Sequence, residues 1–143
     1  MTSDIDDLAS IPLGMAEAWN CCDADAFASR FSSTADFIAF EGTHLEGRDA
    51  IAAFHREIFA TVVKGSEIAA TVRFVRAVAP DVAVVHAAAD VTLAGHTAPS
   101  PGRRSMQLFV VTRGADGTWQ VEAMQNARQL TLAHQAALDA APE

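Results

Sequence analysis

The segment FEGTHLEGRDAIAAFHREIF (residues 40–59) passes from a turn bounded by glycines into an amphipathic helix. From residue 48 onward, four large apolar side chains and one histidine recur at helical spacing: Ile51, Phe54, His55, Ile58 and Phe59. Positions i, i+3, i+4, i+7 and i+8 share one face of a helix, so this face is expected to cover a core. His55 is the polar residue within that apolar face, which makes it the first residue to consider for a site.

Two further helices are expected before this segment. Residues 7–20 place apolar side chains at helical spacing in spite of Pro12. Proline is compatible with the first turn of a helix, so Pro12 is a candidate for the true start. The run CDADAFASRF (residues 22–31) predicts a second, short helix with Asp23 as its N-cap.

The remaining segments have the composition of strands. ADFIAF (residues 35–40) predicts a short strand, and EGTHLEG (residues 41–47) a turn or small hairpin. After the helix, turn sequences separate four predicted strands at residues 66–78, 81–94, 103–113 and 118–127. The alanine-rich tail predicts either a short helix or a frayed end.

This order of elements predicts an α+β fold in one domain spanning residues 1–143. Helices come first, and consecutive antiparallel strands follow, so the helices are expected to cover one face of a curved, mostly antiparallel sheet. The core is expected at about residues 7–128, with residues 129–143 peripheral. A chain of 143 residues is long enough for one substantial core and short for two.

Composition excludes some classes of partner. The net charge is −8, and the basic residues cluster only at Arg103-Arg104, so neither nucleic acid nor an anionic membrane is expected as a partner. The first ten residues lack the basic start and apolar run of a signal peptide. Cys21 and Cys22 are adjacent, which disfavours a disulfide, and reduced thiols fit a cytoplasmic protein.

The run AWNCCDADAFASRFSSTADFIAFEGTHLEGRDAI (residues 18–51) resembles the SnoaL-like superfamily, also called ketosteroid-isomerase-like or nuclear-transport-factor-two-like. It is most similar to the SgcJ/EcaC group, through GRDAIAAFHREIF (47–59), APDVAVVHAAAD (79–90) and GTWQVEAMQN (117–126). This resemblance implies a cone-shaped barrel with an apolar pocket between the helices and the concave sheet, usually in a homodimer. One such fold hosts many functions, so the resemblance does not identify a reaction.

The sequence lacks the residues that the ketosteroid isomerases use in catalysis, so their mechanism is excluded. Those enzymes use a tyrosine on the first helix as oxyanion donor and an aspartate at the end of the first strand as base. Here the corresponding positions hold Met15 and approximately Ala39, and the chain contains no tyrosine. The predicted strand at residues 103–113 also has no Asp or Glu that could serve as a neutral donor.

Three residues are candidates for acid–base catalysis: His55, His86 and Glu41. Histidine titrates near neutrality, so His55 could serve as a general base at the pocket wall, or equally be a core histidine bonded to a carbonyl or carboxylate. Residues 82, 84, 86 and 88 share one face of a strand; if that face is concave, His86 could approach His55, and equally it could be a strand histidine at a dimer face or capped by Asp90. Glu41 is expected near the pocket mouth, where a solvated carboxylate is the commoner outcome.

A further set is expected to bind a ligand: Trp19, Phe37, Phe40, Phe59, Gln107, Asn126 and Arg48. The aromatic rings would line an apolar pocket for small flat or cyclic molecules. Gln107 and Asn126 could orient a ligand, although strand amides more often bind backbone. Arg48 and His44 flank the helix start; Arg48 is expected to bridge the hairpin to a carboxylate such as Glu46 or Asp36.

No cofactor and no metal is expected, because the histidines are dispersed and the phosphate-loop, Rossmann and GxSxG motifs are absent. The sequence therefore predicts a pocket protein for a small hydrophobic molecule, such as a polyketide-like or aromatic intermediate of secondary metabolism. A cofactor-independent cyclase, isomerase or hydratase using histidine is one possibility. A non-catalytic ligand-binding or dimeric interaction module of the same fold is the other.

Overall fold

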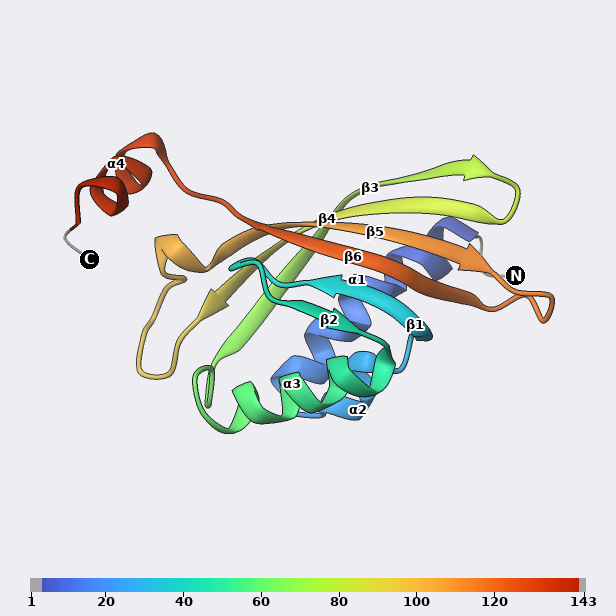
Figure 1. Ribbon diagram of the computed structural model, residues 1–143, viewed down its shortest axis with the longest axis horizontal. Helices are drawn as coiled ribbons and strands as arrows, with labels where there is room; N and C mark the ends of the chain where they lie inside the picture. Colours follow the sequence, from blue (N-terminus) through green and yellow to red (C-terminus); the bar gives the residue numbers. More distant parts are fainter. Residues whose placement is uncertain (1–3, 142–143) are drawn as a thin grey trace.

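Three helices lie on one side of the sheet in the structure, a computed structural model that describes residues 4–141 (Figure 1). They are α1 (Asp4–Asn20), α2 (Ala24–Ala28) and α3 (Arg48–Ala60). Asp23 caps α2 as expected, because its side chain accepts a hydrogen bond from the amide of Ala26 at 3.0 Å. The predicted helices are therefore confirmed, and α2 is shorter than expected.

The sheet has six strands in the order β2-β1-β6-β5-β4-β3. Their bounds are β1 (Phe31–Ile38), β2 (His44–Glu46), β3 (Glu67–Ala79), β4 (Val82–Thr92), β5 (Arg104–Arg113) and β6 (Trp119–Arg128). All neighbours are antiparallel except β1 and β6, which run parallel. The α+β fold and the four consecutive antiparallel strands are confirmed.

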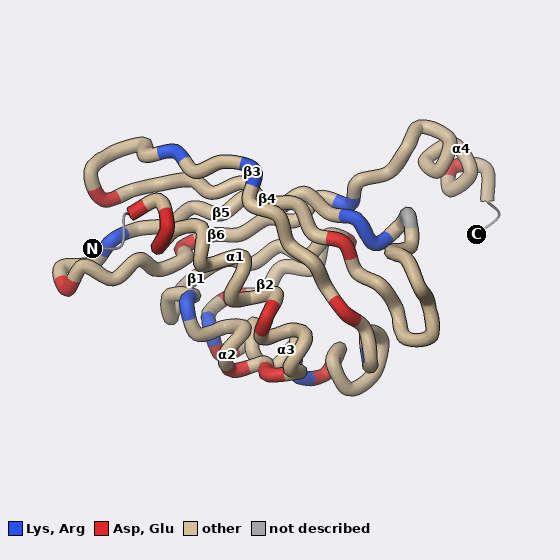
Figure 2. Tube along the Cα trace, turned by 180° about the vertical axis from the view of Figure 1, so that it is seen from behind, with Lys and Arg blue, Asp and Glu red and all other residues tan. Residues whose placement is uncertain are grey.

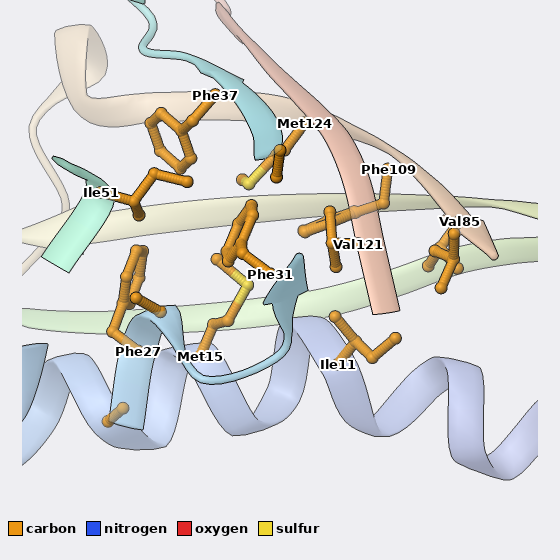
Figure 3. Packing of buried hydrophobic residues seen from close by; sticks show 14 of the residues in the cluster. Ile11, Met15, Phe27, Phe31, Phe37, Ile51, Val85, Phe109, Val121 and Met124 are labelled. Atoms are coloured by element: carbon orange, nitrogen blue, oxygen red, sulfur yellow. The ribbon is translucent and has the colours of Figure 1, made fainter. Parts of the chain in front are cut away.

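Buried and more exposed residues alternate along the strands, so the sheet has an inner face towards the helices and an outer face. In β4, Ala83, Val85 and Ala87 are fully buried, whereas Val84 and His86 between them are only half-buried. The inner face packs against α1; Figure 3 shows Met15 of α1 pointing towards Phe31 of β1. The core of the protein therefore lies between the helices and this inner face.

Two boundaries differ from expectation. Pro12 lies inside α1 rather than at its start, and its side chain is buried in the core. The acidic residues Asp4, Asp6 and Asp7 occupy the first turn instead, where negative charge favours the helix dipole. Strand β1 begins at Phe31 rather than at Ala35, because its first residue pairs with Val121 of β6.

The tail forms a short helix that lies apart from the core. Helix α4 (Leu132–Ala140) has Thr131 as N-cap, whose side chain accepts a hydrogen bond from the amide of His134 at 3.1 Å. None of its residues is buried, and Figure 1 shows it projecting beyond one end of the sheet. The tail is therefore peripheral in position. Among the described residues, no helix is long and apolar enough to cross a bilayer.

Candidate functional site

A cavity of about 420 Å³ opens between α3, the end of β1 and the end of β6. Its wall is mostly apolar and includes Trp19, Phe37, Phe54 and Ile58. The polar side chains around it come from different elements: Glu41, Thr43, His55, Arg103 and Asn126. An apolar wall with a few convergent polar groups is typical of a small-molecule site.

A smaller recess of about 70 Å³ extends this space towards β5. It shares His55 and Asn126 with the larger cavity and adds Ser105 and Gln107. Gln107 lies opposite Asn126 in the β5–β6 register, so both amides occupy neighbouring positions on the inner face. Both residues therefore line the recess, and their role towards a ligand stays a prediction.

His55 lies at the wall of both spaces, with only 2% of its surface exposed to solvent. Aromatic rings surround it: the ring centre of Phe27 lies 4.1 Å away, that of Phe37 5.1 Å and that of Trp19 6.5 Å. Burial in this apolar environment lowers the pKa of His55 to about 4, against a smaller raising effect of its hydrogen bond to Ile51. The imidazole is therefore neutral at physiological pH.

The hydrogen bond of His55 determines which ring nitrogen is available. Nδ1 lies 2.7 Å from the carbonyl oxygen of Ile51, one turn earlier in α3. A carbonyl only accepts, so the single proton of the neutral ring is on Nδ1. Nε2 then carries a lone pair and has no hydrogen-bond partner in the described part of the chain. Both sequence readings hold in part: His55 is a core histidine bonded to a carbonyl, and it also lines the pocket.

Asn126 provides a second acceptor. Its side-chain oxygen Oδ1 is buried and has no hydrogen-bond partner among residues 4–141. Buried polar atoms are nearly always paired in folded proteins, and an unpaired one costs free energy. Since Asn126 lines both the cavity and the recess, a bound molecule with an O–H or N–H group could satisfy this oxygen.

Aromatic and charged residues meet at the mouth of the cavity. The guanidinium carbons of Arg128 and Arg103 lie 4.6 Å and 5.8 Å from the ring centre of Phe40. Glu41 is exposed at the same mouth, and its carboxylate accepts a hydrogen bond from the hydroxyl of Thr43 at 2.6 Å. Glu41 therefore lies at the mouth, and its candidate catalytic role stays a prediction. Arg103 was not predicted as a site residue, although the Arg103-Arg104 pair is the one basic cluster of the sequence.

The sequence left two positions open for His86, and the one on the concave face near His55 is wrong. The ring of His86 lies on the outer face of the sheet, stacked on Phe74 with the ring centres 4.1 Å apart. The inner face of β4 is formed by the residues that alternate with His86, which are small or branched, such as Val85. Periodicity alone defines two faces of a strand and does not say which one the helices cover.

Two predicted ligand-binding residues lie outside the cavity wall. Phe59 is buried in the core, edge-on to Trp19 with ring centres 5.1 Å apart, and does not line the cavity. Arg48 donates to the carbonyl oxygen of Phe31 at 3.4 Å, so the expected bridge to a carboxylate is wrong. Trp19, Phe37 and Phe40 line the cavity, and their role towards a ligand stays a prediction.

His44, rather than Arg48, pairs with the hairpin carboxylates. Its Nε2 lies 2.8 Å from Asp36, and its Nδ1 lies 3.9 Å from Glu46. These three side chains are exposed, and their ligand atoms lie within 4.8 Å of one another. They form a polar cluster on the β1–β2 hairpin, outside the cavity.

The profile of the SnoaL-like domain matches residues 11–126, which is most of the chain. The protein belongs to the SnoaL-like domain family. A domain of unknown function with a cystatin-like fold from Nostoc punctiforme is 45% identical, with a TM-score of 0.90 over 97% of this chain and 86% of its own. The SnoaL-like assignment agrees with the resemblance seen in the sequence, whereas the SgcJ/EcaC subgroup stays a prediction.

More distant structures share the fold of this SnoaL-like domain. A ketosteroid isomerase-like protein from Erwinia carotovora atroseptica is 17% identical, with a TM-score of 0.73 over 92% of this chain and 100% of its own. Aln2 from a Streptomyces species is also 17% identical, with a TM-score of 0.70 over 94% of each chain. No curated protein matches the sequence.

Proposed function

We propose that this SnoaL-like domain binds a small, mainly apolar molecule that carries a hydroxyl or N–H group, and that His55 accepts a hydrogen bond from that group. The supporting observation is the state of His55, which lines the cavity: the ring is buried and neutral, Nδ1 is held by Ile51, and Nε2 is left as the acceptor of the ring. The unpartnered oxygen of Asn126 favours the same kind of donor.

The size and wall of the cavity favour a molecule of about two fused rings. A volume of about 420 Å³ lies at the lower end of the range for small-molecule sites. The rings of Trp19, Phe37 and Phe54 offer flat apolar contacts, so a planar ligand would bury most of its surface against them. These features fit an aromatic or polyketide-like metabolite.

Catalysis, where it occurs, would use Nε2 of His55 as the base. A proton transfer, cyclisation or hydration needs such an acceptor close to the reacting group. A pKa of about 4 makes the imidazole fully available as an acceptor at neutral pH, but a weak base. The geometry therefore supports binding more directly than it supports turnover, and the non-catalytic binding module is the second candidate function.

Binding is tested by calorimetric titration with β-naphthol and naphthalene, which differ only in one hydroxyl group. We expect β-naphthol to bind about fivefold to tenfold more tightly, the usual effect of one hydrogen bond, and the His55→Phe variant to lose this difference. Trp19 lines the cavity and Trp119 does not, so only the Trp19 indole N–H signal should shift in NMR spectra. Equal affinities for the two probes would contradict the proposed role of His55.

Catalysis is tested separately with β-tetralone, a bicyclic ketone with exchangeable C–H protons next to its carbonyl group. An acid–base enzyme should accelerate deuterium uptake at those positions, and His55→Phe should abolish the acceleration. Saturable binding of β-tetralone without any acceleration would favour the non-catalytic module.

A further inference from the structure

We propose that the ligand of this cavity is an anion, whose carboxylate or equivalent acidic group binds Arg103 and Arg128 at the mouth while its apolar, hydroxyl-bearing end lies at His55 and Asn126. This inference rests on the proposed function and adds the chemical class of the ligand: an amphipathic hydroxy acid.

The two arginines are brought together by the sheet. Arg103 precedes β5 directly, and Arg128 at the end of β6 lies opposite Ser105 of β5. The amide of Gln129 also donates to the carbonyl oxygen of Arg104 at 2.8 Å, which holds these two strand ends side by side. Figure 2 shows basic residues gathered at this end of the sheet, on the side of α4.

Neither guanidinium is neutralised by a carboxylate. Within residues 4–141, the ion pairs of arginine involve Arg56, Arg104 and Arg113, and none involves Arg103 or Arg128. Both contact the face of Phe40 instead, a cation–π arrangement that leaves their N–H groups available. In a protein of net charge −8, two arginines without acidic partners among the described residues, one lining the cavity and the other against the same ring of Phe40, are a distinctive feature.

Arg103 and Glu41 line the cavity, and Arg128 lies against the ring of Phe40 without lining the wall, so two positive charges and one negative charge lie at or beside the mouth. The carboxylate of Glu41 accepts a hydrogen bond from Thr43, and no ion pair joins it to either arginine in the described part of the chain. The balance is positive, and arginine N–H groups match the planar geometry of a carboxylate.

The polar groups of the cavity therefore differ between its two ends. At the inner wall, Nε2 of His55 and Oδ1 of Asn126 are both acceptors, so they would bind a donor such as a hydroxyl group. Beside Phe40 at the mouth, Arg103 and Arg128 are positively charged donors, so they would bind an anion. A molecule that satisfies both ends has one orientation, with aromatic or alicyclic carbon between its hydroxyl and its acidic group.

The experiment compares a hydroxynaphthoate, with hydroxyl and carboxylate at opposite ends, with the matching hydroxynaphthamide, both titrated into the full-length protein by calorimetry. We expect the carboxylate to bind about tenfold more tightly than the amide at low ionic strength. This advantage should largely disappear in about 1 M salt, where the Debye length is about 3 Å.

Single substitutions test whether Arg103 and Arg128 cause the preference for the carboxylate over the amide. Arg103→Gln and Arg128→Gln should each reduce the preference for the carboxylate several-fold, while Arg103→Lys should retain part of it. Arg104→Gln is the matched control, because Arg104 is paired with Asp90 at 2.8 Å and does not line the cavity. We expect this variant to keep the wild-type preference.

The possible outcomes separate this inference from the proposed function. Binding of the amide and of β-naphthol without any advantage for the carboxylate would overturn the anionic ligand and leave the pocket function standing. An advantage that survives both glutamine variants would overturn the assignment to the two arginines. If no probe shifts the Trp19 indole signal, the proposed function fails, and this inference fails with it.

Discussion

Nδ1 of His55 lies 2.7 Å from the carbonyl oxygen of Ile51, so the helix that carries the histidine also fixes its tautomer. Helix carbonyls are normally bonded to the amide four residues later, and this one is shared with a side chain at the same spacing. The consequence is chemical: the buried ring, which lines the cavity, keeps Nε2 as its unprotonated nitrogen. His55 is therefore suited to accept a proton or a hydrogen bond, and not to donate one.

Acid should destabilise the protein through His55. Its pKa is about 4 in the folded protein against 6.5 as the ordinary value, so the unfolded chain binds the proton first as the pH falls. The stability associated with the neutral ring is complete above pH 6.5 and is lost progressively towards pH 4. Between pH 6.5 and about pH 5, where most carboxylates are still ionised, we expect a loss of about 1.5 kcal/mol in unfolding free energy from this group.

Urea unfolding at a series of pH values measures this loss. The His55→Phe variant should show a shallower slope over the same interval, because phenylalanine fits among the surrounding rings and binds no proton. His96→Gln, a histidine substitution on an exposed loop, is the comparison. A slope in His55→Phe as steep as that of the wild type would contradict the assignment to His55.

Two glycines with positive φ should differ in their tolerance of alanine. A Cβ at Gly47 would lie 2.8 Å from the backbone oxygen of Ser33, and φ there is +89°. At Gly42, φ is +100°, and a Cβ would meet nothing within 4 Å. Gly42→Ala should therefore cost about 1–2 kcal/mol from backbone strain alone, and Gly47→Ala clearly more, because the hairpin and the start of α3 must separate. Thermal unfolding of both variants decides this; equal costs would show that the contact with Ser33 is easily relieved.

Phe109 and Phe74 test the assignment of the two sheet faces. Phe109 is fully buried on the inner face, whereas Phe74 is 48% exposed on the outer face against His86. Phe109→Ala should cost about 3–5 kcal/mol in unfolding free energy, the range for removing a core aromatic ring. Phe74→Ala should cost about 1 kcal/mol, because much of its ring already contacts solvent. Similar costs for the two substitutions in urea unfolding would contradict this division of the sheet.

We propose that the chain forms a homodimer through the outer face of the sheet. Leu108 is 38% exposed there and lies with Ile38 and Val110 around a shallow apolar depression. Leu108→Glu should convert the dimer into a monomer in light scattering, since burying an unpaired charge at an apolar interface is costly. Leu132→Glu, on the 90% exposed position of α4, is the matched control and should remain dimeric. A monomeric mass for the wild-type protein would remove the proposal.

Local sequence was sufficient for most of the elements. Asp23 predicted the cap of α2, and glycine with charged turn residues marked the ends of the strands, because these are short-range effects of backbone conformation and hydrogen bonding. Pro12 was less informative, because a buried proline inside α1 is tolerated when core packing compensates for the lost hydrogen bond. The placement of β1 beside β6, as the single parallel pair, required contacts across most of the chain.

The candidate site was only partly predictable. The sequence identified His55 as the polar residue on an apolar helix face, and Asn126 and Gln107 as amides on apolar strands, from periodicity alone. It could not decide which face of β4 is covered, so it left both positions of His86 open, and the outer one is observed. It also gave no reason to combine Arg103 with Arg128, because 24 residues and a strand hairpin separate them along the chain.

The sequence by itself determined the order of helices and strands, the amphipathic face that carries His55, and the absence of the tyrosine and aspartate used by ketosteroid isomerases. These properties depend on residue identity and local spacing. Tertiary structure decided which sheet face the helices cover, the low pKa of His55, the unpartnered oxygen of Asn126 and the meeting of two arginines at Phe40. Burial and the pairing of charges depend on distances between elements remote in sequence, and those distances exist only after the chain has packed.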